Sequence, residues 1–175
     1  MTAAMKRLAA IVFAPEQNVD ALIAAFVADA QREGCRVAGV RQIESAADDC
    51  TGAVQAVDIS SGARFRLMQD LGAGAGACRV DPAAIARVGQ IVGAAVRERP
   101  DLIVVNRFGK LEAEEKDGVV AEIGAAVAAG VPVLVAVSRR FLSAWNEFAA
   151  GMDAQVPCDR AALDAWWRAV TADAA

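Results

Sequence analysis

The chain has 175 residues, of which 56% are hydrophobic and 23% are charged, and its formal net charge is −4. That length suits one domain with a substantial core, and that composition excludes a disordered chain. Lysine and arginine are scattered along an acidic chain, which argues against a nucleic-acid partner because phosphate backbones are bound by clustered basic side chains. We therefore expect a single domain over residues 1–175 that binds no nucleic acid.

Two buried strands with a helix between them are predicted first. Leu8–Phe13 is a continuous apolar run, which is typical of a parallel strand buried on both faces. Apolar residues at helical spacing predict a helix over Val19–Glu33, with Asn18 as its N-cap. Cys35–Val40 is predicted as the second strand. A hairpin follows, predicted from strand-like runs on either side of a Ser-Ser-Gly turn, Val54–Ile59 and Arg64–Met68.

Amphipathic helices alternate with buried strands in the second half of the chain. Asp81-Pro82 is a strong helix start, and that helix ends before Pro100. The alternation predicts an α/β fold of three layers, with a mainly parallel sheet, helices on both faces and an inserted β-hairpin. The remaining predicted elements are strands at Leu102–Val105 and Pro132–Val137 and helices near Gly118–Ala129, Phe141–Ala150 and Arg160–Val170.

Ligands of such sheets bind beyond the carboxyl ends of the strands. We expect four segments at that edge, and they contain most of the candidate site residues. They are Ala14–Asp20, the Gly-rich loop Gly72–Arg79, Asn106–Glu112 and Ser138–Arg140.

The Gly-rich loop has two interpretations. Its backbone N–H groups could form an anion-binding nest beside Arg79, or it could be a loop without a ligand. Cys78 borders this loop and a cationic residue, so it is either an activated thiol or a buried structural one. The carboxylates of Glu112, Glu114 and Glu115 are either a base or metal ligands, or the solvated start of a helix.

Histidine is absent from the sequence, which removes Ser–His and Cys–His nucleophile pairs and the commonest metal ligand. The cysteines include no Cys-x-x-Cys pair, so we expect reduced thiols, with Cys35 and Cys158 structural. No metal and no cofactor are predicted.

The longest apolar run, Ile123–Val137, is interrupted by glycine and proline and is shorter than the ~20 residues that span a bilayer. We expect a cytoplasmic protein without a membrane partner. Whether the protein forms a homo-oligomer is left open by the sequence.

The segment Asp101–Glu112 reads Asp-Leu-Ile-Val-Val-Asn-Arg-Phe-Gly-Lys-Leu-Glu. It resembles the strand and turn of the P-loop nucleoside triphosphatases related to the thermophile enzyme, whose turn reads Asp-Glu-x-Gly-Lys-Met-Glu. A closer similarity, to a bacterial group known as a domain of unknown function, is carried by Gly74–Pro82, Val105–Glu112 and Trp145–Gly151. Relatives of that group are named alongside molybdenum transport. The resemblance implies a P-loop NTPase-like fold over most of the chain.

The catalytic positions of that family are altered here. A working P-loop reads Gly-x-x-x-x-Gly-Lys-Ser/Thr, because backbone N–H groups and the lysine hold the phosphates and the hydroxyl holds Mg²⁺. The resemblance places Asn106 where the family has its Mg²⁺-holding acid, with Arg107 beside it. The P-loop positions themselves are occupied by Phe13, Asn18, Val19 and Asp20. The loss of both the phosphate-binding residues and the Mg²⁺-holding residues argues against hydrolysis.

We therefore expect a non-hydrolysing binding protein of P-loop descent for a small oxyanion or phosphorylated ligand, with molybdate suggested by family context alone. The alternative is a divergent Mg²⁺-dependent nucleoside triphosphatase or phosphotransferase in which Asp20 and Glu112 hold the metal. A third hypothesis is thiol chemistry at Cys78 with Cys50. No catalytic residue is assigned. The predicted ligand-binding residues are Asn18, Gly72, Gly74, Gly76, Arg79, Asn106, Arg107, Lys110 and Arg139, with Cys78 as a candidate reactive thiol.

Overall fold

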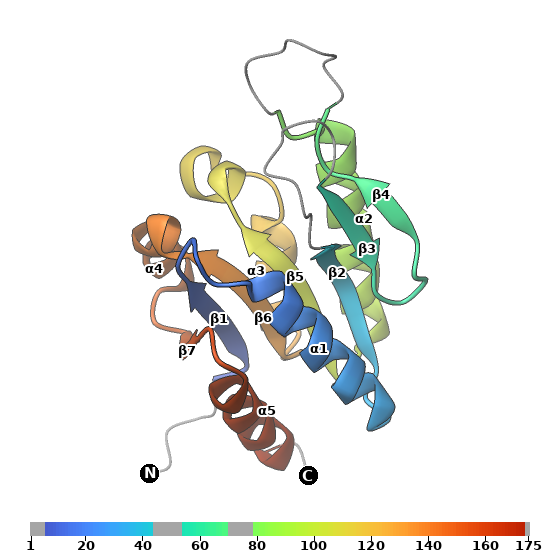
Figure 1. Ribbon diagram of the computed structural model, residues 1–175, viewed down its shortest axis with the longest axis vertical. Helices are drawn as coiled ribbons and strands as arrows, with labels where there is room; N and C mark the ends of the chain where they lie inside the picture. The colour runs from blue at the N-terminus through green and yellow to red at the C-terminus, as the bar shows by residue number, and fades with distance from the viewer. Residues whose placement is uncertain (1–5, 44–53, 70–78, 174–175) are drawn as a thin grey trace.

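The computed structural model describes residues 6–43, 54–69 and 79–173, which form a sheet flanked by helices (Figure 1). The sheet has seven strands within those ranges, in the order β4-β3-β2-β5-β6-β1-β7. The strands are β1 Leu8–Phe13, β2 Val37–Ile43, β3 Gln55–Asp58, β4 Arg64–Arg66, β5 Leu102–Phe108, β6 Val133–Ser138 and β7 Asp153–Pro157.

Five strands pair with one another in parallel, and the other two add to the sheet through antiparallel pairing. β7 pairs with β1, β1 with β6, β6 with β5 and β5 with β2, all in parallel. β3 and β4 extend the β2 edge as an antiparallel hairpin. The predicted mainly parallel sheet with an inserted hairpin is therefore confirmed. Because the five parallel strands end at one edge, the segments that follow them meet there, toward the top of Figure 1.

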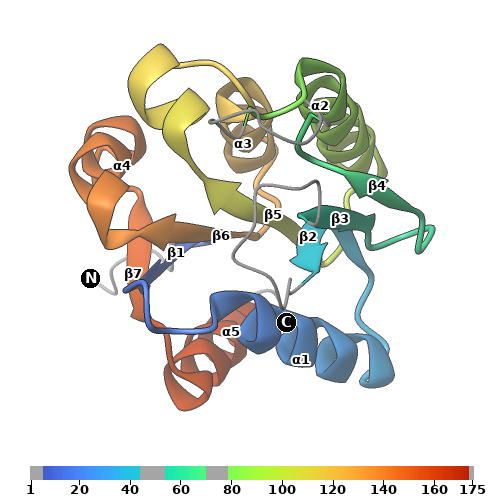
Figure 2. The same cartoon turned by 45° about the horizontal axis from the view of Figure 1, so that its top comes forward.

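Helices cover both faces of the sheet, as Figure 2 shows, with α1 and α5 on one face and α2, α3 and α4 on the other. The central strands are apolar throughout because both of their faces are buried, and β5 is the example. Ile103 and Val105 pack into the core beneath α2 and α3, whereas Leu102 and Val104 pack into the core beneath α1 and α5. The helices are α1 Val19–Arg32, α2 Pro82–Glu98, α3 Val120–Ala128, α4 Leu142–Ala149 and α5 Arg160–Asp173, with a π-helical turn at Leu111–Glu115 and a 3₁₀ turn at Arg139–Phe141.

The predicted helix starts are confirmed at α1 and α2. The side chain of Asn18 accepts a hydrogen bond from the backbone N–H of Ala21 at 2.9 Å. Asp81 caps α2 in the same way through the N–H of Ala83, with Pro82 in the first turn. Each cap satisfies a backbone donor that has no partner within its helix.

Three strands depart from the sequence prediction. β2 runs on to Ile43 and β5 runs on to Phe108, whereas the predicted strands ended at Val40 and Val105. β7 was not predicted at all. Its sequence, Asp-Ala-Gln-Val-Pro, alternates polar and apolar residues and ends in proline, which suits an edge strand that pairs on one side only. Within the described ranges, no helix combines the length and the apolar character needed to cross a membrane.

Candidate functional site

The carboxyl end of β5 carries a β-bulge. Val105 pairs with Val135 of β6 and Phe108 pairs with Val137, so β5 takes three steps where β6 takes two. The two polar residues Asn106 and Arg107 lie inside this irregularity. In a regular strand consecutive side chains point to opposite faces, whereas a bulge re-aims them. The bulge accounts for the convergence of both side chains on the same partners.

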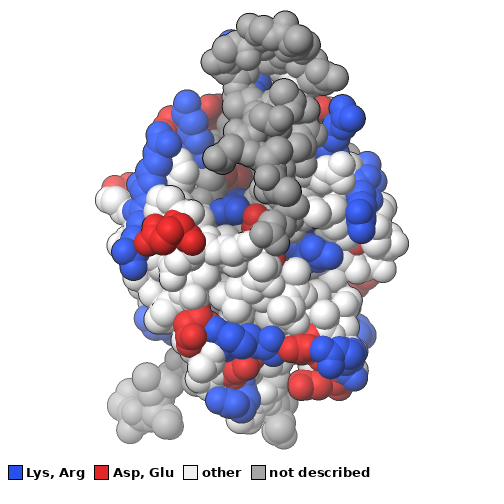
Figure 3. Space-filling view, viewed as in Figure 1, with Lys and Arg blue, Asp and Glu red and all other residues white. Residues whose placement is uncertain are grey.

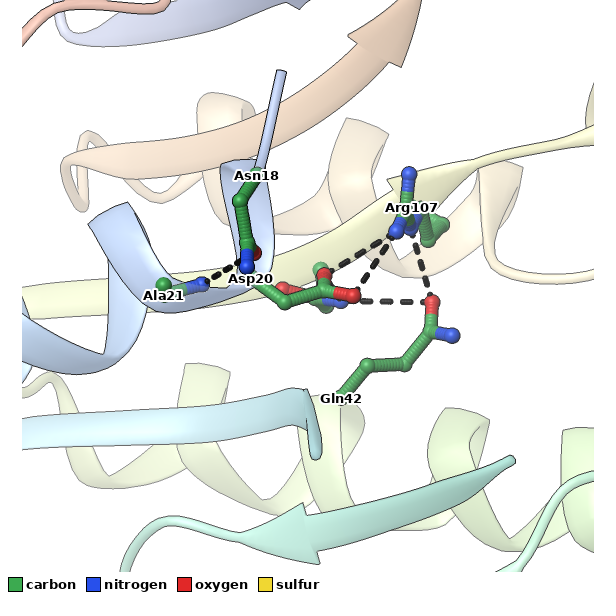
Figure 4. Close-up of polar contacts among 6 residues, drawn as sticks. Asn18, Asp20, Ala21, Gln42 and Arg107 are labelled. Atoms are coloured by element: carbon green, nitrogen blue, oxygen red, sulfur yellow. Dashed lines mark hydrogen bonds and ion pairs between the residues drawn. The ribbon is translucent and has the colours of Figure 1, made fainter. Parts of the chain in front are cut away.

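Four side chains form what we call the polar cluster: Asp20 from the first turn of α1, Gln42 from β2, and Asn106 and Arg107 from β5 (Figure 4). Arg107 donates from Nη2 to both carboxylate oxygens of Asp20, at 3.0 and 2.9 Å, and from Nε to Oε1 of Gln42 at 2.9 Å. Asn106 donates from Nδ2 to Oδ1 of Asp20 at 3.0 Å and to Oε1 of Gln42 at 3.2 Å. The cluster therefore joins three elements through side chains alone.

The charges of the polar cluster balance. The Asp20 side chain is 15% exposed and that of Arg107 is 34% exposed, so the ion pair is shielded from solvent only in part. The guanidinium also lies over the ring of Phe13, 4.7 Å from its centroid, which is a cation–π arrangement. Figure 3 shows basic and acidic atoms meeting in a hollow at the centre of this face. Arg107 is thus held in place by Asp20, Gln42 and the ring of Phe13.

Unused hydrogen-bonding capacity remains on two members of the polar cluster. Nη1 of Arg107 has no acceptor among the described residues, because its Nε and Nη2 groups make all of the recorded bonds. Oδ1 of Asn106 is buried and finds no donor in the described part of the chain. A carbonyl oxygen accepts and a guanidinium N–H donates. The cluster therefore contains an unsatisfied cationic donor and a buried, unsatisfied neutral acceptor.

The turn between β1 and α1, residues 14–18, is closed on itself. The backbone N–H of Gln17 donates to the carbonyl of Ala14 at 3.0 Å, and that of Val19 donates to the carbonyl of Gln17 at 3.2 Å. Oε1 of Gln17 accepts from the N–H of Ala14 at 2.9 Å. Pro15 has no N–H to offer. Few backbone donors of this turn are thus left for an anion.

With this geometry described, comparison with protein-family models matches residues 8–166 to "Protein of unknown function (DUF2478)". The chain belongs to this family. The DUF2478 chain is also 38% identical, over 164 residues, to "Molybdenum import ATP-binding protein ModC 2" of Bradyrhizobium diazoefficiens. That alignment covers 93% of this chain and 18% of the relative, so the chain spans less than a fifth of the length of the curated relative it matches.

Two solved structures share the fold of the DUF2478 chain. A human cancer-related nucleoside triphosphatase superposes with a TM-score of 0.65 at 13% identity, covering 95% of this chain and 96% of that one. THEP1 from the hyperthermophile Aquifex aeolicus superposes with a TM-score of 0.63 at 14% identity, covering 93% and 96%. These likenesses confirm the predicted P-loop NTPase-like fold. At such identities they carry no information about activity.

Among the predicted ligand-binding residues, Asn106 and Arg107 are brought together in the DUF2478 chain. Asn18 serves as the helix cap of α1, two residues before Asp20. The other cations lie at the surface: Lys110 pairs with Glu114 at 3.7 Å, and Arg79 and Arg139 are exposed. The predicted nest and the thiol pair lie outside the described residues, at Gly72, Gly74, Gly76, Cys50 and Cys78.

The two carboxylates of the predicted metal site have separate partners. Glu112 is buried, and its oxygens accept from the backbone N–H groups of Gly109 at 2.9 Å and Val119 at 3.2 Å. Asp20 faces Arg107 instead. Within the described ranges, no group of three or more histidine, cysteine or acidic side chains is arranged to hold a metal ion. Glu112 therefore ties the turn after β5 to the start of α3.

The two described cysteines behave as packing residues. Cys35 and Cys158 are half-buried against the core beneath α1 and α5. Burial raises the pKa of both thiols above the ordinary value, and at Cys158 the positive charge of Arg107 opposes part of that rise. Both thiols are thus less readily ionised than a free cysteine, which fits their predicted structural role.

Gln42 is the residue of the polar cluster that the sequence prediction missed. The prediction ended its strand at Val40, where the apolar run stops, and so placed Gln42 outside the sheet. A polar residue directly after the apolar part of a parallel strand was the available signal. Asp20 was predicted only as a metal ligand, and its pairing with Arg107 has no counterpart in the sequence pattern.

A pocket of about 440 Å³ lies at the opposite edge of the sheet, before the parallel strands begin. Arg7, Asp101 and Pro132 line it, and they stand at or next to the starts of β1, β5 and β6. Its position sets it apart from the polar cluster, which lies where the same strands end.

Proposed function

We propose that this DUF2478 domain binds a small oxyanion or phosphorylated ligand at the carboxyl edge of its sheet and does not hydrolyse nucleotides. One observation carries the proposal: at the place where α/β sheets bind ligands, the β5 bulge holds a partly exposed arginine, Arg107, whose Nη1 edge has no acceptor among the described residues. Guanidinium groups match oxyanions in both charge and geometry. Further cations at this edge, Lys110 and Arg139, add attraction at longer range.

The β1–α1 turn supports the non-hydrolysing half of the proposal. It stands where the resemblance places the P-loop, and we interpret it as a degenerate Walker A segment. A working P-loop aims its backbone N–H groups at the phosphates. Here those of Ala14, Gln17 and Val19 are bonded within the turn. Glu16 also places negative charge in the turn, which would repel a triphosphate.

Molybdate is the first oxyanion to test, because the relative from Bradyrhizobium diazoefficiens is named for molybdenum import. The name belongs to a much longer protein, of which the aligned part is 18%. A domain in such a chain could present molybdate, or a phosphorylated ligand, to the transport machinery. This part of the proposal rests on the name of the relative, whereas the oxyanion class rests on the polar cluster.

The proposal is tested by calorimetric titration with molybdate, sulfate, phosphate and ATP, each with and without Mg²⁺, alongside an assay for phosphate release. At least one simple oxyanion is expected to bind independently of Mg²⁺, and no phosphate is expected to be released from ATP. A ligand present at 100 times its dissociation constant also stabilises the fold by about 2.7 kcal/mol, which gives a thermal shift of several degrees as a second readout. Mg²⁺-dependent ATP binding with turnover would favour the divergent NTPase instead.

Asp20→Asn is the variant that probes the site in this experiment. Asp20 occupies Nη2 of Arg107 and cancels its charge, so an anionic ligand competes with it. Removing the carboxylate charge while keeping the shape is expected to tighten anion binding on the order of tenfold, since a partly shielded pair interacts by a few kcal/mol at most. Asp173→Asn is the matched control, because Asp173 pairs with Arg7 at the opposite edge. Equal affinities for both variants would place the anion elsewhere.

A further inference from the structure

Asn106 presents a buried hydrogen-bond acceptor without a donor among residues 6–43, 54–69 and 79–173. The residue is 4% exposed, and within those ranges its Oδ1 lacks a partner. The orientation of the amide follows from its neighbours, because Nδ2 donates to Oδ1 of Asp20 and Oε1 of Gln42. If the amide nitrogen and oxygen of Asn106 were exchanged, its oxygen would face two other acceptor oxygens, Oδ1 of Asp20 and Oε1 of Gln42. The acceptor therefore stays on the side away from Asp20 and Gln42.

A buried acceptor without a donor is unfavourable by about 1–3 kcal/mol, and most buried polar groups in native proteins are paired. Asp20 and Gln42 lie on the nitrogen side of the amide, so their contacts with Asn106 leave Oδ1 unsatisfied. Arg107, its neighbour on the same bulge, has an unused donor edge at Nη1. A ligand that bridges these two residues must accept from the guanidinium and donate to Asn106.

We propose that Asn106 makes the site selective for oxyanions that carry a proton, namely hydrogen phosphate or the monoanion of a phosphomonoester. This inference rests on the proposed oxyanion site and narrows its ligand class. Such a ligand supplies anionic oxygens for Arg107 and an O–H donor for Oδ1 of Asn106. Sulfate and molybdate carry no proton at neutral pH, so either would set an anionic oxygen against that carbonyl oxygen.

Selectivity of this kind is large when the polar group is buried. A site built to bond a hydroxyl rejects an analogue that lacks it, because the buried group is then left unpaired. The buried acceptor of Asn106 favours phosphate, whereas the name of the relative favours molybdate. One titration series with both anions distinguishes the two expectations.

The test is calorimetric titration of the unaltered chain at neutral pH with phosphate, arsenate, sulfate and molybdate. Phosphate and arsenate carry a proton there and are expected to bind at least about tenfold more tightly than the other two, which corresponds to about 1.4 kcal/mol. Phosphate is expected to keep this preference above its second pKa, because hydrogen phosphate still carries one proton, whereas the binding of a phosphomonoester is expected to weaken as the pH rises above its own second pKa. Equal or tighter binding of sulfate or molybdate overturns the selectivity but leaves the oxyanion site standing. Binding of none of the four overturns both.

Asn106→Leu assigns the selectivity to this residue. Leucine has a similar volume and removes the acceptor, so the ratio of phosphate to sulfate affinity is expected to fall toward one. An unchanged ratio in a folded variant, checked by its thermal melt, would show that another group discriminates. If the variant does not fold, the comparison of four anions on the unaltered chain still decides the proposal.

Discussion

Replacing Arg107 by alanine is expected to weaken oxyanion binding by about 100-fold, because a bonded ligand loses one or two charge-assisted hydrogen bonds of about 1.5–3 kcal/mol each. The substitution also leaves the carboxylate of Asp20 in the cluster without its cation, which adds repulsion toward any anion. The measurement is calorimetric titration with the tightest-binding oxyanion found for the unaltered chain.

Two variants control for indirect effects of Arg107→Ala. Arg7→Ala removes another arginine that pairs with an aspartate, but at the opposite edge of the sheet, and is expected to leave affinity within about twofold, since Arg7 lies well outside the reach of direct contact. Arg107→Lys keeps the charge but loses the planar guanidinium, so partial binding is expected. If Arg107→Ala binds the anion as tightly as the unaltered chain while folding normally, the polar cluster is not the binding site.

Gly39→Ala is expected to lower the free energy of unfolding by about 4 kcal/mol or more, at the upper end for point substitutions. Gly39 lies in β2 with φ +105°, a conformation that residues with a Cβ rarely adopt. An added Cβ would stand 2.1 Å from the backbone carbonyl oxygen of Val104 in β5. Neither atom can move without shifting the β2–β5 pairing, which positions Gln42 beside Asn106.

Urea denaturation measures this effect, with Gly124→Ala as its control. Gly124 lies in the middle of α3, and an added Cβ there meets nothing within 4 Å, so its replacement is expected to stabilise by up to about 1 kcal/mol. If Gly39→Ala lowers the free energy of unfolding by less than about 1 kcal/mol, β2 does not approach β5 as closely as described.

The architecture could be predicted because its signals are local. The apolar runs of β1, β5 and β6 indicate strands buried on both faces, and their alternation with helical spacing leaves a layered parallel sheet as the consistent arrangement. The starts of α1 and α2 follow from Asn18 and Asp81 in the same way, since capping depends on neighbouring residues only.

Features that depend on strand pairing could not be predicted. β7 is short and has no continuous apolar run, and its strand conformation comes from its pairing with β1 rather than from its own residues. The bulge in β5 likewise exists only relative to β6. The predicted strand stopped at Val105, before the polar residues Asn106 and Arg107, whereas the register extends to Phe108.

The candidate site was predicted in position but only partly in composition. The rule that ligands bind beyond the strand ends placed Asn106 and Arg107 correctly at one edge. It could not show that Asp20 neutralises Arg107, because that pairing joins residues 87 positions apart. Lys110 and Arg139 also lie in segments that follow strands, yet Lys110 pairs with Glu114 on the surface.

The anomalous scattering of arsenic or molybdenum in crystals grown with arsenate or molybdate tests the central claim most directly, because it locates the bound anion. We predict a peak beside the polar cluster, within contact distance of Nη1 of Arg107 and of Asn106, with the Asp20–Arg107 pair loosened or opened. A peak in the turn at residues 14–18, with Asp20 and Arg107 still paired, would contradict the assignment and place the phosphate site in the turn between β1 and α1.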